Sequence, residues 1–594
     1  MKKGFTLIEL LAVIVILAII ALISTPIVLN IIKDSKKLSQ LKSARFYVGA
    51  VETSIAQATL NNKKLLNGNY NILKNGNICI EYNEDKCINE LKIKVNGETP
   101  ISGKITILDG KINYVKLKYE NDKNIGYNEK NELIFLESDP YKESENIEIP
   151  NLYNNTLTPV IYDGDNWRVA DVTDKWYDYS KQEWANAVIL DSNVKKEVGD
   201  PITVDGTNPD VLAMFVWIPR YEYKIEGTYG KGGINASIPG EIEINFIKKD
   251  TNEPTENYII HPAFNFGGNH ISGIWVGKFE LSHKTKIYSL NCTTETCSES
   301  EGIRILPNVQ SLRNNKVSSF FYAIRSMSKD KNVFGIDSNI LDTHMIKNSE
   351  WGAVAYLSQS RYGKYGNNNY EGTNKEVYIN NSSNMITGRS GGSYGGNTAV
   401  NTVYTDHPNE NTLYSSFGYY TYDGYLLEYN TNKKLKKRDM KTIASTTGNI
   451  YGIYDMSGGA WDYAFGVFEN SDGEKWSGNS SNSNSGFAGK VGTLGDNITG
   501  LEWPEQKYYE VYKAKNGTSI NLTTACNNEI CYGHALSETQ KWYGDYVAMV
   551  SPSGSWFMRG DYYGSVSAGV FSAAANDGSA YGSRSTRVVI VPII

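Results

Sequence analysis

The sequence lacks a strong excess of charge of either sign. Its 594 residues include 59 lysines and arginines against 65 aspartates and glutamates, which gives a formal net charge of −6. This balance argues against general electrostatic binding of nucleic acid, because such binding needs a positively charged surface. The sequence also lacks a fixed-period repeat and a glycine-rich strand–helix phosphate loop. We therefore expect no nucleic-acid partner, in a chain with room for two or three domains.

The N-terminus carries a long apolar run. Almost every side chain from Phe5 to Ile23 is apolar, and Glu9 is the one ionisable exception. A helix of this length spans about 30 Å of hydrocarbon, and no small-x-small cleavage site follows it. Lys2 and Lys3 precede the run and place the N-terminus in the cytoplasm. We therefore expect a single membrane-spanning helix over 5–32, with the rest of the chain outside.

Glu9 indicates that this helix does more than anchor the chain, because an ionisable residue in an apolar span is unfavourable and usually functional. The string KKGFTLIE resembles the prepilin signal of the type IV pilin and pseudopilin superfamily. The resemblance implies that a prepilin peptidase removes the leader 1–4 by cutting after Gly4. It also implies that Phe5 becomes the methylated N-terminus and that Glu9 pairs with the amine of a neighbouring subunit. The alternative is a plain signal anchor that contains a glutamate.

Cysteine is scarce, and its six copies fall in close pairs. The pairs are Cys79 with Cys87, Cys292 with Cys297, and Cys526 with Cys531. An even number of cysteines in an exported chain favours disulfides within these pairs. Zinc is the competing interpretation, and His534, three residues after the last pair, is the one near miss for a histidine ligand.

After the apolar run the helix is predicted to continue to residue 62. Apolar residues step by three and four along it and form one stripe. They are Leu41, Ala44, Val48, Val51, Ile55 and Ala58. Residues 63–137 are predicted to form a small β head, since apolar and polar residues alternate on both sides of Asp109-Gly110, a strong hairpin signal.

A polar segment with two prolines, 138–151, is the candidate linker to a larger domain over 152–594. In that domain, aromatic segments alternate with loops rich in asparagine and glycine. The loops at 362–412 and 469–500 are long for a compact domain. The stretch 477–486 is predicted to be a flexible surface loop. Together with the helix and the β head, these patterns favour an α+β protein.

Five short motifs of the distal domain resemble those of the formylglycine-generating-enzyme family, which has a variant of the C-type lectin fold. They are VWIPR (216–220), GIWVGKFE (273–280), YDMSGGAWDY (454–463), GSWFMRG (554–560) and SRSTRVVIV (583–591). The resemblance covers about 210–594, and 152–209 is expected to be an N-terminal addition. It implies an irregular, C-type-lectin-like distal domain.

The same resemblance implies that the chain is not an enzyme. The formylglycine-generating members bind copper through two cysteines soon after the Gly-Ser-Trp motif, whereas no cysteine follows Trp556 here. The related sulfoxide synthases need an iron-binding histidine set, and the six histidines of this chain are scattered. We expect no cofactor, except that Asp455 and Asp462 are candidate Ca²⁺ ligands. The alternative is that Asp455 caps a turn and Asp462 is solvated.

The remaining expectation is binding, because loops on a rigid frame often carry recognition. In diversity-generating lectin-fold proteins the final segment displays the ligand-contacting side chains, and Trp, Tyr and Arg dominate interface hot spots. The candidate ligand-binding residues are Arg559, Tyr562, Tyr563, Tyr581 and Arg584. The alternative for this segment is a role in the frame of the fold, which we expect for Trp556 and Arg587.

These interpretations predict a minor or tip type IV pilin-like protein that displays an adhesin domain binding a surface glycan or protein. Its precursor would lie in the membrane, and the assembled subunit would lie in a pilus on the cell surface. A domain of about 400 residues on every subunit would crowd a dense filament, which favours rare or tip incorporation. The alternatives are a pseudopilin that binds secreted cargo or DNA, and a pilin-anchored enzyme.

Overall fold

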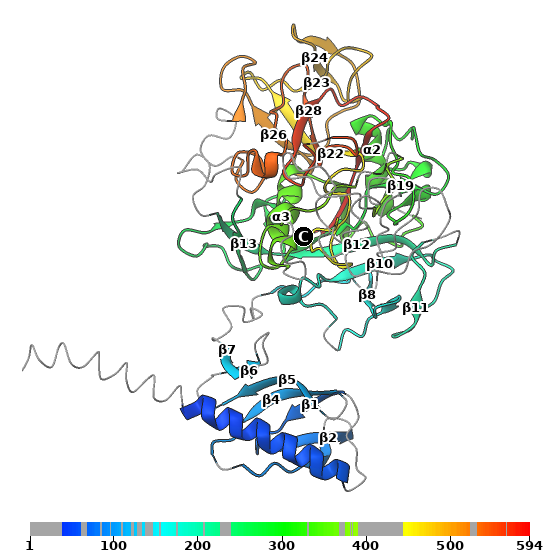
Figure 1. Cartoon of the computed structure of the whole chain (residues 1–594). Coiled ribbons are helices and arrows are strands. Elements are labelled where there is room, and N and C mark those ends of the chain that lie inside the picture. Colours follow the sequence, from blue (N-terminus) through cyan, green and yellow to red (C-terminus); the bar gives the residue numbers. More distant parts are fainter. Residues whose placement is uncertain are drawn as a thin grey trace, which may run out of the picture. The chain divides into compact units, whose positions relative to one another are not determined.

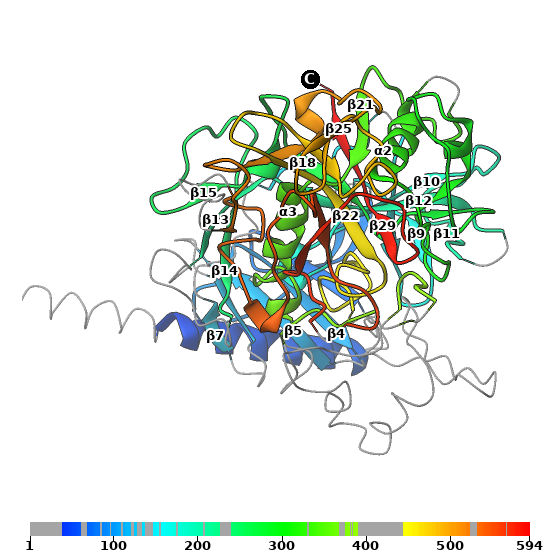
Figure 2. The ribbon, with the colours of Figure 1, turned by 90° about the horizontal axis from the view of Figure 1, so that it is seen from above.

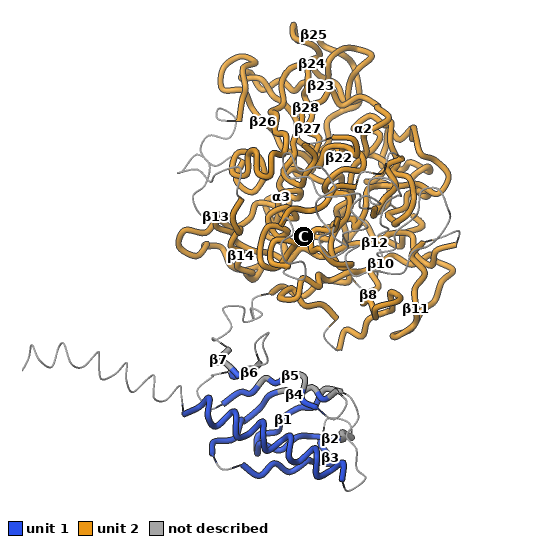
Figure 3. Tube along the Cα trace, viewed as in Figure 1, with its two compact units in different colours: residues 1–142 blue, residues 143–594 orange. Residues whose placement is uncertain are grey.

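A computed structural model describes residues 39–60, 68–136 and 147–593, apart from internal gaps of which the longer are 120–123, 128–132, 226–238, 368–374, 390–443 and 523–530. The chain forms two compact units, 1–142 and 143–594, and Figure 3 colours them separately. The boundary falls inside the predicted linker 138–151. Among the described residues, no helix is long and apolar enough to cross a membrane. The predicted span 5–32 lies outside those residues.

The described part of the small unit is one helix on one antiparallel sheet. Its seven described strands run in the spatial order β3 (Lys86–Leu91), β2 (Ile78–Asn83), β1 (Gly68–Ile72), β4 (Ser102–Leu108), β5 (Lys111–Lys118), β6 (Asn124–Tyr127) and β7 (Leu133–Leu136). The helix over 39–60 lies across one face of this sheet (Figure 1). Its predicted stripe packs on the sheet: Ala44, Val48, Val51 and Ile55 are buried in one apolar cluster with Ile105 and Val115.

The predicted hairpin is confirmed by the register of β4 and β5. Leu108 pairs with Lys111, so two residues connect the strands, as an Asp-Gly turn requires. A second hairpin, β2–β3, carries the Cys79–Cys87 disulfide. Along these strands, apolar side chains on the face toward the helix are buried and form a largely aliphatic core.

The large unit is built on an antiparallel sheet whose described strands number eight. In spatial order they are β11 (Pro201–Ile202), β9 (Trp167–Val169), β8 (Thr158–Tyr162), β10 (Asn186–Leu190), β12 (Val211–Pro219), β18 (Gly273–Gly277), β30 (Val588–Pro592) and β21 (Leu341–Met345). The strand β30, late in the sequence, lies between β18 and β21. Residues about 300 positions apart therefore share the centre of the sheet.

A second sheet and two helices complete the core. The sheet has the order β26 (Glu510–Lys513), β22 (Trp461–Glu469), β27 (Trp556–Arg559) and β28 (Ala573–Asn576), and β29 (Arg584–Thr586) also pairs with β22. The helices are α2 (Val317–Arg325) and α3 (Asn348–Ser358), and α3 lies beside β22 (Figure 2). Sheets dominate and helices are few among the described residues, in keeping with a broad α+β class.

Small sheets surround this core. They are β14–β13–β15 (Ile242–Phe246, Tyr221–Ile225, Ile259–Ile260), β16–β17 (Asn265–Phe266, Asn269–His270), β19–β20 (Ser282–His283, Ile303–Arg304) and β23–β24–β25 (Trp476–Gly478, Gly489–Val491, Asp496–Ile498). The last of these corrects the two ends of the surface loop predicted over 477–486, while residues 479–482 are exposed and lie outside the strands. Ser477 and Ser485 are buried, and their hydroxyls lie 2.8 Å apart, so small polar residues pack here. Much of the other predicted loop, 362–412, lies outside the described residues.

The end of the predicted linker belongs to the large unit. The indole of Trp217 donates to the carbonyl of Glu148 at 3.2 Å, and the indole of Trp275 donates to that of Asn151 at 2.8 Å. Two core tryptophans therefore fix residues 148–151, because a buried indole N–H needs an acceptor.

Candidate functional site

The predicted ligand-binding residues do not form one surface. Arg559, at the end of β27, is fully buried. Its guanidinium donates to the carbonyls of His534 (3.2 Å) and Ala535 (2.9 Å), and burial lowers its pKa to about 10. The prediction that Arg559 contacts a ligand at the surface is wrong, because its planar donors hold the backbone of the segment 534–535.

Tyr562 and Tyr563 form an aromatic pair just after β27. Their ring centroids lie 5.5 Å apart at 86°, and the backbone N–H of Tyr563 donates to Gly459. Tyr562 is 37% exposed, while Tyr563 is partly buried. Tyr562 is therefore the more exposed of the two tyrosines.

Tyr581, on the loop that leads into β29, lies beside Arg584, the first residue of that strand. Tyr581 is 56% exposed, and the guanidinium carbon of Arg584 lies 4.4 Å from its ring centroid. Arg584 also donates to the hydroxyl of Tyr463 (3.2 Å) and lies 3.6 Å from Asp577. These contacts fix the guanidinium under the ring, so the exposed tyrosine is held in one orientation.

A second tyrosine–arginine pair, absent from the sequence prediction, adjoins the first. Tyr288 is 43% exposed, and Arg313 lies under its ring at 5.1 Å. Arg313 also donates to the carbonyl of Gly582 (2.7 Å), and the N–H of Asn314 donates to the carbonyl of Tyr581. We call Tyr288, Arg313, Tyr581 and Arg584 the tyrosine patch.

Sequence reasoning missed half of the patch for a simple reason. Tyr288 and Arg313 lie about 290 and 270 residues before Tyr581, and no periodic pattern links them. Two exposed tyrosines on two fixed arginines are a suitable recognition surface, because rigid aromatic rings bind with little loss of side-chain entropy.

The two candidate Ca²⁺ ligands lie in a buried cluster of charges. Asp455 accepts hydrogen bonds from the Asn380 side chain (2.8 Å) and the Gly388 N–H (2.9 Å). Asp462 accepts from Arg587 at 3.2 Å, and Arg587 also donates to the carbonyl of Gly277. Both aspartates are buried, so the alternative that Asp462 is solvated is wrong.

Burial dominates the electrostatics of this cluster. It raises the pKa of Asp455 to about 6 and that of Asp462 to about 7, and it raises the pKa of nearby Glu280 well above its usual range. Glu280 accepts from the N–H of Ala460 and from Ser311. Arg587 is fully buried, as predicted from the motif, and it is the cation that faces these acids.

Disulfides are present at two of the cysteine pairs. They join Cys79 to Cys87 and Cys292 to Cys297. Cys531 is also disulfide-bonded, while Cys526 lies outside the described residues. Within the described part, the residues whose side chains could bind a metal and that lie close together are Cys292, Cys297 and Glu299. Because both sulfurs are already joined to each other, they are not thiolate ligands.

The predicted processing and assembly residues, Gly4, Phe5 and Glu9, lie outside the described residues. Residues 1–25 match the family model described as the prokaryotic N-terminal methylation motif. This match supports the type IV pilin segment and indicates a pilin- or pseudopilin-like precursor that a prepilin peptidase processes and that assembles with other subunits. A comparison with curated proteins finds no match to the chain. The likeness of 210–594 to the formylglycine-generating-enzyme family stays a prediction.

Proposed function

We propose that this chain is a minor or tip pilin-like subunit that displays its large unit as a binding domain on the cell surface. The observation that carries the proposal is the methylation-motif match over residues 1–25, which supplies the assembly segment. Later in the chain, the helix over 39–60 buries its apolar stripe on the small sheet. A helix fixed in this way can carry a second compact unit without relying on that unit for its own packing.

The tyrosine patch is the proposed recognition surface for a glycan or protein. Tyr and Arg are enriched among residues that dominate binding energy, and the arginines here are already fixed by the protein. We propose binding without catalysis and without a metal ion, because the oxygens of Asp455 are committed to Asn380 and Gly388 and Asp462 is paired with Arg587. EGTA should therefore leave binding unchanged.

Two substitutions at the N-terminus test the assembly part of the proposal. Gly4→Ala should block removal of the leader, and Glu9→Val should remove the carboxylate that pairs between subunits. Both variants should remain in the membrane and be lost from filaments sheared off the cells, as measured by immunoblot. Glu52→Val, on an exposed position of the described helix, is the matched control and should assemble normally. Normal filament incorporation of both N-terminal variants would refute the assembly role.

A further inference from the structure

The large unit contains a cavity of about 900 Å³ that the proposed recognition surface does not use. It is lined by the β16–β17 hairpin, the start of α3, the segment 505–511 and His534. Its volume is that of a typical small-molecule site. The chemistry of its lining indicates what it can hold.

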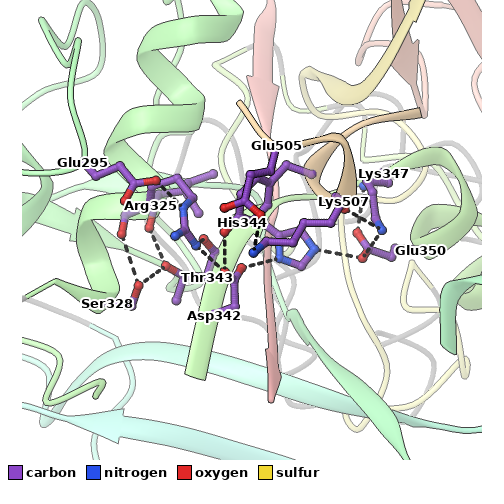
Figure 4. A network of polar contacts seen from close by, with 12 residues as sticks. Glu295, Arg325, Ser328, Asp342, Thr343, His344, Lys347, Glu350, Glu505 and Lys507 are labelled. Atoms are coloured by element: carbon purple, nitrogen blue, oxygen red, sulfur yellow. Dashed lines mark hydrogen bonds and ion pairs between the residues drawn. The ribbon is translucent and has the colours of Figure 1, made fainter. Parts of the chain in front are cut away.

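Phe266, which we call the floor of the cavity, rests on a histidine that is fixed by two carboxylates outside the lining. Phe266 stacks on the imidazole of His344, with centroids 5.0 Å apart and planes at 13°. Nδ1 of His344 lies 2.9 Å from an oxygen of Asp342, and Nε2 lies 2.8 Å from an oxygen of Glu350 (Figure 4). Because both ring nitrogens face carboxylates, both carry protons. Burial alone would lower the pKa of His344, but the two carboxylates more than offset it and raise that pKa.

Each lysine in the lining already has a partner. The ammonium of Lys347 donates to the carbonyl of Lys507 at 3.2 Å and lies 3.5 Å from Glu350. The ammonium of Lys507 lies 2.9 Å from Glu505 (Figure 4). An anionic ligand would therefore have to compete with carboxylates of the protein for these cations.

The other acid and the histidine are also committed. Glu510 accepts from the N–H of Ser349 at the start of α3 (3.1 Å), so it occupies the position where an anion would bind the helix. Nδ1 of His534 lies 2.7 Å from the hydroxyl of Tyr512. Burial lowers the pKa of His534, so its ring is neutral near pH 7. The lining thus has no net charge for a ligand to neutralise.

The groups left to bind a ligand are amides at the rim. Asn265 and Asn269 are exposed on the β16–β17 hairpin, and their side chains make no hydrogen bond to other described residues. The turn between them is Gly267-Gly268 with φ of +61° and +88°, a conformation that glycine adopts freely, so the backbone fixes their spacing. Each amide both donates and accepts, which suits hydroxyl groups that do the same.

We propose that this cavity binds an uncharged oligosaccharide. Uncommitted amides above a preorganised, charge-balanced floor match a polyhydroxyl ligand, whereas an ionic ligand would bring a charge with no free partner. This inference rests on the proposed display function in one respect: the protein would encounter the oligosaccharide outside the cell. Binding by purified protein and filament assembly are separate measurements, so failure of one leaves the other intact.

The test uses the full chain in a detergent without a sugar head group. Saturation-transfer NMR and calorimetry would measure binding of maltotriose, cellotriose and tri-N-acetylchitotriose, with trigalacturonate and triglycine as charged probes. At least one neutral trisaccharide should bind, and an Asn265→Ala/Asn269→Ala double variant should weaken it at least tenfold. Asn497→Ala, at an exposed asparagine on β25, should bind as the parent does.

Three results would overturn the proposal. They are binding of a charged probe only, binding of no probe, and equal binding by the double variant and the parent chain. Unchanged tryptophan fluorescence would show that the double variant is folded, since all eleven tryptophans lie in the large unit.

Discussion

The two units of this chain bury different kinds of side chain. The described core of the small unit consists of aliphatic residues and two tyrosines, placed by the alternation of a sheet and the stripe of a helix. The large unit also buries Arg220, Lys278, Glu280, Arg559 and Arg587. Lys278, for example, donates to the Asn186 side chain and to the carbonyls of Ile450 and Gly452 at 2.7–2.8 Å. The first core is specified by hydrophobic pattern, and the second also depends on polar pairing between distant segments.

The largest effect should come from breaking a buried charge pair in the large unit. Arg587→Met leaves Asp462 without its cation, and removing one partner of such a pair costs about 3–5 kcal/mol. Denaturant unfolding of the full chain, followed by tryptophan fluorescence, would measure the loss in the large unit alone. A cost under about 1 kcal/mol would mean that the acids are protonated and need no cation.

A cavity in the small unit should cost somewhat less. Ile105→Ala in β4 removes a fully buried side chain, with an expected cost of about 3 kcal/mol. Hydrogen–deuterium exchange of peptides from 68–136 should accelerate, while the tryptophan transition should stay in place. A shift of the tryptophan transition would show that the two units unfold together and would remove the basis of the comparison.

A third effect is smaller and depends on pH. The pKa of His344 is raised in the folded state. The charged imidazolium therefore contributes its full stabilisation of the folded state at pH values below the ordinary histidine pKa of about 6.5. That stabilisation is lost as pH rises through the raised value. His344→Gln cannot gain this proton. The difference in unfolding free energy between parent and variant should therefore shrink as pH rises above neutrality, and a constant difference would contradict the charged imidazole.

The smallest effect on stability should come from the tyrosine patch. Tyr581→Ser changes an exposed side chain, so the free energy of unfolding should change by less than about 0.5 kcal/mol. Adhesion of cells carrying the variant to a glycan and host-protein array should nevertheless fall, with Leu494→Ser, another exposed position, as the control. Equal adhesion by the two variants would place recognition elsewhere.

The small unit could be predicted from its sequence, because its signals are local. The stripe through Ala44, Val48 and Val51 and the Asp109-Gly110 turn need only neighbouring residues, and the described structure follows both. The first disulfide closes a hairpin between residues eight positions apart. In such a unit, spacing alone indicates which side chains meet.

The site in the large unit could be predicted only in part. Arg559 and Arg584 lie 25 positions apart and look alike in the sequence, yet one is buried against carbonyls and the other lies beneath Tyr581. The two arginines differ because their partners, such as the His534 carbonyl and Asp577, come from other segments of the chain. A local sequence pattern does not identify such partners. For the same reason the cavity beside Phe266, assembled from five separate segments, had no signal in the sequence.

The position of β30 has a consequence for biogenesis. Strand β21 finds its neighbour in the main sheet only when residues 588–592 are present, since β30 separates it from β18. During synthesis, β21 therefore waits for more than two hundred further residues before its neighbouring strand β30 is available and the main sheet can be completed. Deletion of residues 588–592 would therefore remove the strand that joins β21 to the rest of the main sheet.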